Sequence, residues 1–110
     1  MQEPEILSNP LPVIQKLKHE SRLLYNGHAL VRMFQRELTT EQVEAALNSR
    51  EAEVIRNYPA SGRPSAECLI LGQDQAGKRL HILVAYPKAE VVTVYEPTPP
   101  RWATPRERGR

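Results

Sequence analysis

The segment from His28 to Arg36 carries the side chains best suited to chemistry on an anion. On a helix, His28, Arg32 and Arg36 each lie four residues apart and therefore share one face. Histidine exchanges a proton near neutral pH, and arginine grips phosphate in a two-pronged contact. We expect this helix to pack on Leu30, Met33 and Phe34, which would aim the stripe away from the core. The stripe predicts a phosphate-handling surface or an ordinary solvated basic face.

Metal-independent RNA cleavage needs a base for the 2′-hydroxyl, an acid for the leaving oxygen and cations for the developing negative charge. The chain offers two histidines as proton carriers, arginines as phosphate clamps and hydroxyl groups as donors. The predicted catalytic residues are His28, Arg32, His81 and Tyr95, and the predicted substrate-binding residues are Arg36 and Thr93.

Each candidate has a structural alternative. His28 follows Asn26-Gly27 and could simply bond a backbone carbonyl, and His81 lies in an apolar strand where a histidine is often a satisfied core residue. The two arginines could form surface ion pairs with glutamates nearby, worth about 0.2–1 kcal/mol each. Those glutamates are Glu37, Glu41 and Glu44.

The sequence lacks the motifs of other common kinds of catalytic and binding site. The sequence contains no glycine-rich phosphate loop, no CxxC pair and no HExxH, and its three histidines lack zinc-ligand spacing. The single cysteine, Cys68, lies in an apolar run and is expected to be a small buried hydrophobic residue. We therefore expect no metal, no small-molecule cofactor and no hydrolase nucleophile at Ser65 or Cys68.

Composition points to a small cytoplasmic protein that does not contact membranes. The 110 residues suffice for one domain, and 40% of them are hydrophobic. No apolar run approaches the roughly 18 residues of a membrane helix, and the N-terminus lacks the features of a signal peptide. The net charge of +2 is unevenly distributed, because basic residues dominate 15–36 and the tail while glutamates dominate 37–53.

Three helices are expected in the first half of the chain. Residues 13–20 can form a short helix, residues 22–26 are short and extended, and the second helix begins near His28. The third helix is marked best: Thr39 and Gln42 form a capping box, and Leu38 with Val43 suits a hydrophobic staple. This helix should run to about Asn48.

From Glu53 the hydrophobic period becomes that of strands. Four strands are expected, over residues 53–58, 68–71, 80–86 and 91–95, with a turn over 74–77. Connections this short require antiparallel neighbours. The predicted fold class is α+β: two or three N-terminal helices on one face of a four-stranded antiparallel sheet.

The predicted organisation is a flexible lead-in over residues 1–12, one α+β domain over 13–97, and a basic, Pro/Arg-rich tail over 98–110. We expect Trp102 to pin this tail onto the domain.

The register of the last hairpin decides which side chains share a face. If His81 lies opposite Tyr95 and Ala85 opposite Val91, then Val91, Thr93 and Tyr95 join His81 on the face away from the helices. Another register would separate His81 from Tyr95, and the sequence does not choose between them. We expect the first register because it groups the polar side chains.

An ordered set of short motifs resembles a prokaryotic family, the domain of unknown function 4258. The matching segments are His28-Ala29, Arg32-Met33, Arg36, Leu38-Thr39, Glu41, Val43, Glu53-Val54-Ile55, Tyr58-Pro59, Leu80-His81, Thr93-Val94-Tyr95-Glu96-Pro97 and Trp102. The family's layout in turn resembles the RelE- and barnase-like ribonuclease fold of bacterial toxins. The resemblance implies a possible small antitoxin partner, such as a zinc-ribbon or helix-turn-helix protein.

Two functions from different classes follow. The first is a toxin-type, metal-independent ribonuclease-like module acting on RNA. The second is a catalytically inert module that uses its basic helix face to bind a protein partner or nucleic acid.

Overall fold

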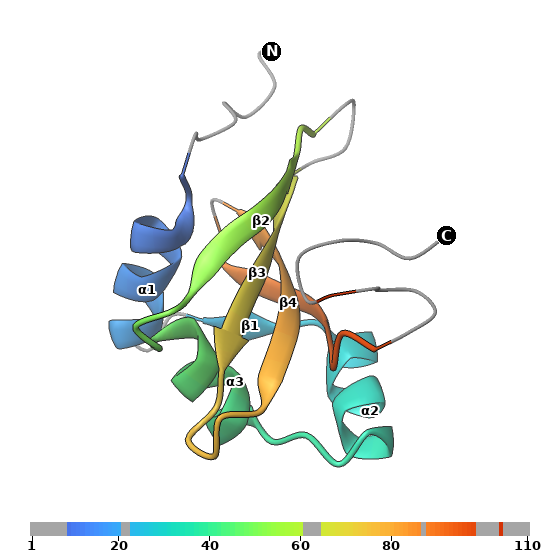
Figure 1. Cartoon of the computed structure of the whole chain (residues 1–110). Helices are drawn as coiled ribbons and strands as arrows, with labels where there is room; N and C mark the ends of the chain where they lie inside the picture. Colours follow the sequence, from blue (N-terminus) through green and yellow to red (C-terminus); the bar gives the residue numbers. More distant parts are fainter. Residues whose placement is uncertain (1–8, 21–22, 61–64, 87, 99–103, 105–110) are drawn as a thin grey trace.

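The computed structural model describes residues 9–20, 23–60, 65–86, 88–98 and 104. Three helices and five strands follow the order α1, β1, α2, α3, β2, β3, β4, β5 (Figure 1). Their bounds are α1 Leu11–His19, β1 Leu24–Tyr25, α2 Gly27–Gln35, α3 Thr40–Leu47, β2 Glu53–Tyr58, β3 Ala66–Gln73, β4 Arg79–Tyr86 and β5 Glu90–Tyr95. The α+β class is confirmed, and the first helix begins two residues before the expected position.

The sheet has five strands and is mixed, so the prediction of four antiparallel strands is wrong in detail. The strand order is β1-β5-β4-β3-β2, and the four strands from Glu53 onward pair antiparallel as expected. The additional strand is β1, which pairs parallel to β5. The amide of Leu24 donates to the Ala89 carbonyl at 2.9 Å, and the amide of Asn26 donates to the Val91 carbonyl at 2.9 Å.

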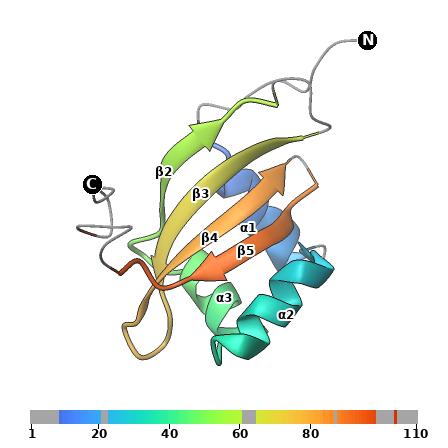
Figure 2. The ribbon, with the colours of Figure 1, turned by 90° about the vertical axis from the view of Figure 1, so that its right-hand side faces the viewer.

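All three helices contribute to one core against one face of the sheet (Figure 2). The strand residues in this core alternate along β4, where Leu80, Ile82, Val84 and Tyr86 are all buried. The intervening residue His81 therefore points to the opposite face of the sheet. This second face is the side away from the helices.

The capping box at the start of α3 is confirmed. The Thr39 side chain accepts a hydrogen bond from the Gln42 amide, and the Gln42 side chain accepts one from the Thr39 amide. Both proposed staple residues, Leu38 and Val43, are buried in the core. The local sequence signal therefore defines this helix start in the structure.

Helix α3 packs very closely on β3 at Gly72. A Cβ built at Gly72 would lie 2.2 Å from the carbonyl oxygen of Ala46. Only glycine leaves room for the helix backbone to approach the strand this closely.

The last hairpin contains a bulge that the prediction did not include. His81 pairs with Tyr95 as expected, but the register shifts after Leu83, so that Val84 pairs with Val91. The predicted pairing of Ala85 with Val91 is therefore wrong. Because β5 carries one extra residue, Val91 faces the core, contrary to the prediction that it joins His81 on the second face.

The expected position of Trp102, and most of the predicted lead-in and tail, lie outside the described residues.

Candidate functional site

Helix α2 is held beside β5 at both of its ends. At its start, the backbone amide of the N-cap residue Asn26 donates to the Val91 carbonyl oxygen at 2.9 Å, and the Asn26 side chain accepts a hydrogen bond from the His28 amide at 2.8 Å. Beyond its last turn, Arg36 Nη1 donates to the Val94 carbonyl oxygen at 2.7 Å. These contacts fix which face of α2 meets the sheet.

The buried face of α2 is not the predicted one. Ala29 and Met33 are buried in the core, whereas Leu30 is 46% exposed and Phe34 is 85% exposed. The prediction that Leu30 and Phe34 pack inward is therefore wrong, although that for Met33 is confirmed. The physical reason is that α2 lies along β5 near the sheet edge, where the small Ala29 and the flexible Met33 fill the contact.

The outward face of α2 combines apolar and basic side chains. Leu30, Val31 and Phe34 are exposed, with Val31 at 56%, and at 100° per residue they form one arc of the helix. His28 and Arg32 are also exposed and continue this arc on one side. We call these five residues the α2 surface.

The predicted residues on α2 have different surroundings. Within the described ranges, the side chains of His28 and Arg32 form no hydrogen bond or ion pair, so the proposed pairing of Arg32 with Glu37, Glu41 or Glu44 is not formed. Arg36 is instead engaged with the Val94 carbonyl in β5. The basic stripe is thus divided into two solvent-facing side chains and one that contacts the sheet.

The predicted residues on the strands come together on the second face. His81 Nδ1 lies 3.3 Å from Tyr95 Oη, and the two rings meet edge to face with centroids 5.2 Å apart. Thr93 is half-buried one row away, opposite Leu83. His81 itself is fully buried. The structure therefore brings three of the six predicted residues together, separated by the sheet from the α2 surface.

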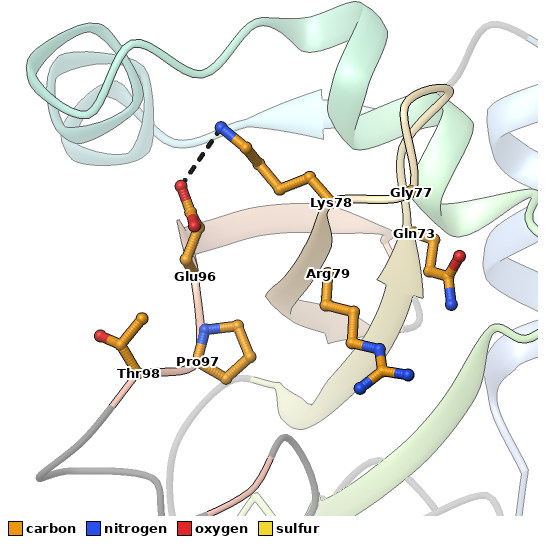
Figure 3. Close-up of a pocket in the computed structure, with 7 residues that line it drawn as sticks. All are labelled: Gln73, Gly77, Lys78, Arg79, Glu96, Pro97 and Thr98. Atoms are coloured by element: carbon orange, nitrogen blue, oxygen red, sulfur yellow. Dashed lines mark ion pairs between the residues drawn. The ribbon is translucent and has the colours of Figure 1, made fainter.

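A pocket opens beside this group, and the sequence reasoning missed the residues that line it. It has a volume of about 560 Å³ and is lined by Gln73, Gly77, Lys78, Arg79, Glu96, Pro97 and Thr98 (Figure 3). Lys78 Nζ lies 3.2 Å from Glu96 Oε1 across the pocket. Two consecutive cations after the predicted turn at Gly77 were the available sequence signal.

The turn that carries Lys78 is held by Asp74. Asp74 Oδ1 accepts from the amides of Ala76 and Lys78, at 2.9 and 2.8 Å, and Oδ2 accepts from Gln42 Nε2 at 2.9 Å. The hydrogen bond from Gln42 is the main reason that the pKa of Asp74 is lowered from its ordinary value of 3.8. Gly77 completes the turn with a φ of 84°, a conformation that favours glycine.

Burial raises the pKa of two further side chains, Tyr25 and Cys68. Burial raises the pKa of the Tyr25 hydroxyl above its ordinary value of 10.0, and the charges of Glu44 and Glu41 add to this effect. Burial also raises the pKa of the Cys68 thiol to about 12, assisted by the charge of Glu67. The expectation that Cys68 is a buried hydrophobic residue is confirmed, and its thiol is poorly suited to act as a nucleophile.

The described part of the chain contains no cluster of three or more histidine, cysteine or acidic side chains that could hold a metal ion. Nor does any helix in these ranges have the length and apolar character needed to cross a membrane.

The fold and these surfaces define a small α+β domain with a mixed sheet, helices on one face and a polar group on the other. A family model described as a domain of unknown function (DUF4258) matches residues 25–96, and the chain belongs to this family. The match spans every element from the end of β1 through β5. No curated protein and no solved structure matches the chain significantly. The resemblance to RelE- and barnase-like ribonucleases therefore stays a prediction.

Proposed function

We propose that this domain is a binding module whose α2 surface docks an acidic amphipathic helix of a partner protein. The observation that carries the proposal is the exposure of Phe34, at 85%, beside the exposed Leu30 and Val31 on one short helix. Contiguous exposed apolar side chains bordered by polar residues are typical of protein interaction sites. Aromatic residues, phenylalanine among them, are also enriched at protein–protein interfaces.

The charge of this surface specifies the chemistry of the partner. His28 and Arg32 flank the apolar residues and carry no carboxylate partner among the described residues. A helix with leucine-like side chains on one face and carboxylates along its border would match both features. A small antitoxin protein, which the family resemblance implies, would be such a partner if it presents an acidic amphipathic helix.

Two other candidate partners, a second copy of the chain and RNA, fit the α2 surface less well. A second copy of the chain would bring two Arg32 guanidiniums into one small interface if two α2 helices packed against each other. RNA would satisfy the arginine, but its charged backbone would leave Leu30 and Val31 without apolar contacts. The mixed character of the surface therefore favours a protein helix.

The test begins with a photo-crosslinking amino acid placed at position 34 in cells, with the exposed turn residue Gln75 as the control position. We expect position 34, but not position 75, to form a discrete adduct with one protein. The purified partner should then bind the wild type more tightly than Phe34→Asp and Arg32→Glu. An adduct with RNA or with a second copy, or equal binding of the variants, would refute the proposal.

A second candidate function is metal-independent RNA cleavage, in which the half-buried Tyr95 would meet the RNA and the fully buried His81 would act through its contact with Tyr95. The nearby Lys78 and Arg79 could supply positive charge for a phosphate. In this form the mechanism does not use His28, because the sheet separates it from His81. Both candidate functions are proposed for a cytoplasmic protein.

Induced expression in a bacterial host tests this second function through growth arrest and cleavage of cellular RNA. Tyr95→Phe should reduce cleavage while His28→Ala retains it. Absence of cleavage by the wild-type protein would refute this second function, and only the binding function would stand.

A further inference from the structure

We propose that the pocket at the β3–β4 turn binds a phosphate group through Arg79, and that Glu96 limits this binding by holding Lys78. The site is distinct from the α2 surface, and it requires neither a docked partner nor catalysis. Its evidence is the charge arrangement within the pocket.

Arg79 is the cation available to a ligand. It is exposed at the first position of β4, and none of the described carboxylates lies within ion-pair distance of its guanidinium. Arg79 lines the pocket, and in Figure 3 its side chain points away from the pair formed by Lys78 and Glu96. A guanidinium presents paired donors that match the oxygens of phosphate.

Two carboxylates close to the turn, Asp74 and Glu51, have hydrogen-bond partners of their own. Asp74 accepts hydrogen bonds from two amides of its own turn and from Gln42. Glu51 accepts a hydrogen bond from the side chain of Gln73, which pairs with Arg79 in the sheet. Neither carboxylate forms an ion pair with Arg79 within the described ranges.

Lys78 is a second cation of the pocket, and it is paired with Glu96 when no ligand is bound. Its ammonium contacts Glu96 at 3.2 Å, and both side chains are substantially exposed, at 41% and 46%. Exposed pairs of this kind are weak and exchange readily with other ions. A phosphate group in the pocket would therefore compete with Glu96 for Lys78.

The backbone of the turn that carries Lys78 and Arg79 is held by several hydrogen bonds. The amides of Ala76 and Lys78 are tied to Asp74, and Asp74 is tied through Gln42 to helix α3. The positive φ of Gly77 closes the same turn. A ligand would therefore meet a preformed backbone at this turn, while the exposed side chains of Lys78 and Arg79 would still lose entropy on binding.

Two sources could supply the phosphate group: free inorganic phosphate or the phosphodiester of single-stranded RNA. The test titrates the full-length protein with inorganic phosphate and, separately, with a five-nucleotide oligouridylate. Binding is followed through the amide resonances of Gly77, Lys78 and Arg79. Shifts with phosphate identify the free anion as a ligand, and shifts with RNA alone identify the phosphodiester.

Variants with opposite expected effects make the test specific. Arg79→Gln should weaken binding at least tenfold, because it removes the guanidinium that would contact the phosphate. Glu96→Gln should tighten binding about threefold, because it frees Lys78 and removes a repelling carboxylate. Lys88→Gln, an equally charge-reducing change in the β4–β5 connection, is the control and should leave the affinity nearly unchanged.

Equal weakening by Arg79→Gln and Lys88→Gln would show a general charge effect and overturn the proposal. Unchanged or weakened binding in Glu96→Gln would do the same, as would the absence of shifts with both ligands. All three substituted side chains are exposed, and unchanged amide spectra away from the pocket confirm that each variant is folded.

Discussion

Arg36 Nη1 donates a 2.7 Å hydrogen bond to the carbonyl oxygen of Val94, which connects the end of α2 to the last strand of the sheet. This bond helps to set the rotation of α2, so that Met33 faces the core and Phe34 faces solvent. The surface proposed for partner binding therefore depends on a contact made by its neighbouring arginine.

Arg36→Ala should lower the free energy of unfolding by about 1–2 kcal/mol, because a charge-assisted hydrogen bond to the sheet is lost. Arg32→Ala is the matched control, because its side chain is exposed and forms no bond within the described ranges. Urea unfolding of both variants checks the expectation. Equal stability of the two variants would show that the Val94 contact contributes nothing.

Gly72→Ala should destabilise the protein by roughly 3 kcal/mol or more, because the added Cβ would lie 2.2 Å from the Ala46 carbonyl oxygen. Gly27→Ala has open space around the added carbon and should change the stability by less than about 1 kcal/mol. Thermal unfolding measures both effects. A small effect at Gly72 would mean that α3 does not pack this closely on β3.

The protein should lose stability on acidification partly through Asp74. Its pKa is lowered in the folded state, so its stabilising contribution is present above the ordinary value of 3.8 and is lost as the pH falls through the folded-state pKa. Asp74→Asn removes this titration and should flatten the dependence of unfolding free energy on pH below about 4. Identical pH profiles for the two proteins would contradict the expectation.

Thr39→Ala should lower the free energy of unfolding by about 1 kcal/mol, because it removes the hydrogen bond to the Gln42 amide. Thr39→Ser retains the hydroxyl and should recover most of the loss. Urea unfolding distinguishes the variants, and equal losses in both would show that the capping bond is not the cause.

Local sequence signals predicted most elements of this fold. The capping box at Thr39 and the turn at Gly77 depend on neighbouring residues, and both are present in the structure. Strand β1 has only two residues, and its pairing depends on where the chain passes β5, which a local pattern does not encode. The bulge in β5 arises in the same way from pairing between distant residues.

The candidate site was predicted less completely for the same reason. Strand alternation left two registers open for the last hairpin, and the expected one, which pairs His81 with Tyr95, is confirmed. The orientation of α2 did not follow from its own sequence, because Leu30, Met33 and Phe34 are all apolar and only the contact with β5 selects Met33. Lys78 and Arg79 gain their relation to Glu96 only when the hairpin forms.

The most direct test of the binding function is the dissociation constant of the partner captured at position 34, measured by calorimetry for the wild type and Phe34→Asp. The account predicts that Phe34→Asp weakens binding about 30-fold or more, since exposed aromatic anchors commonly contribute at least about 2 kcal/mol. The unfolding free energy should stay unchanged, because Phe34 is 85% exposed. Equal dissociation constants for the two proteins would contradict the assignment of α2 as the docking surface.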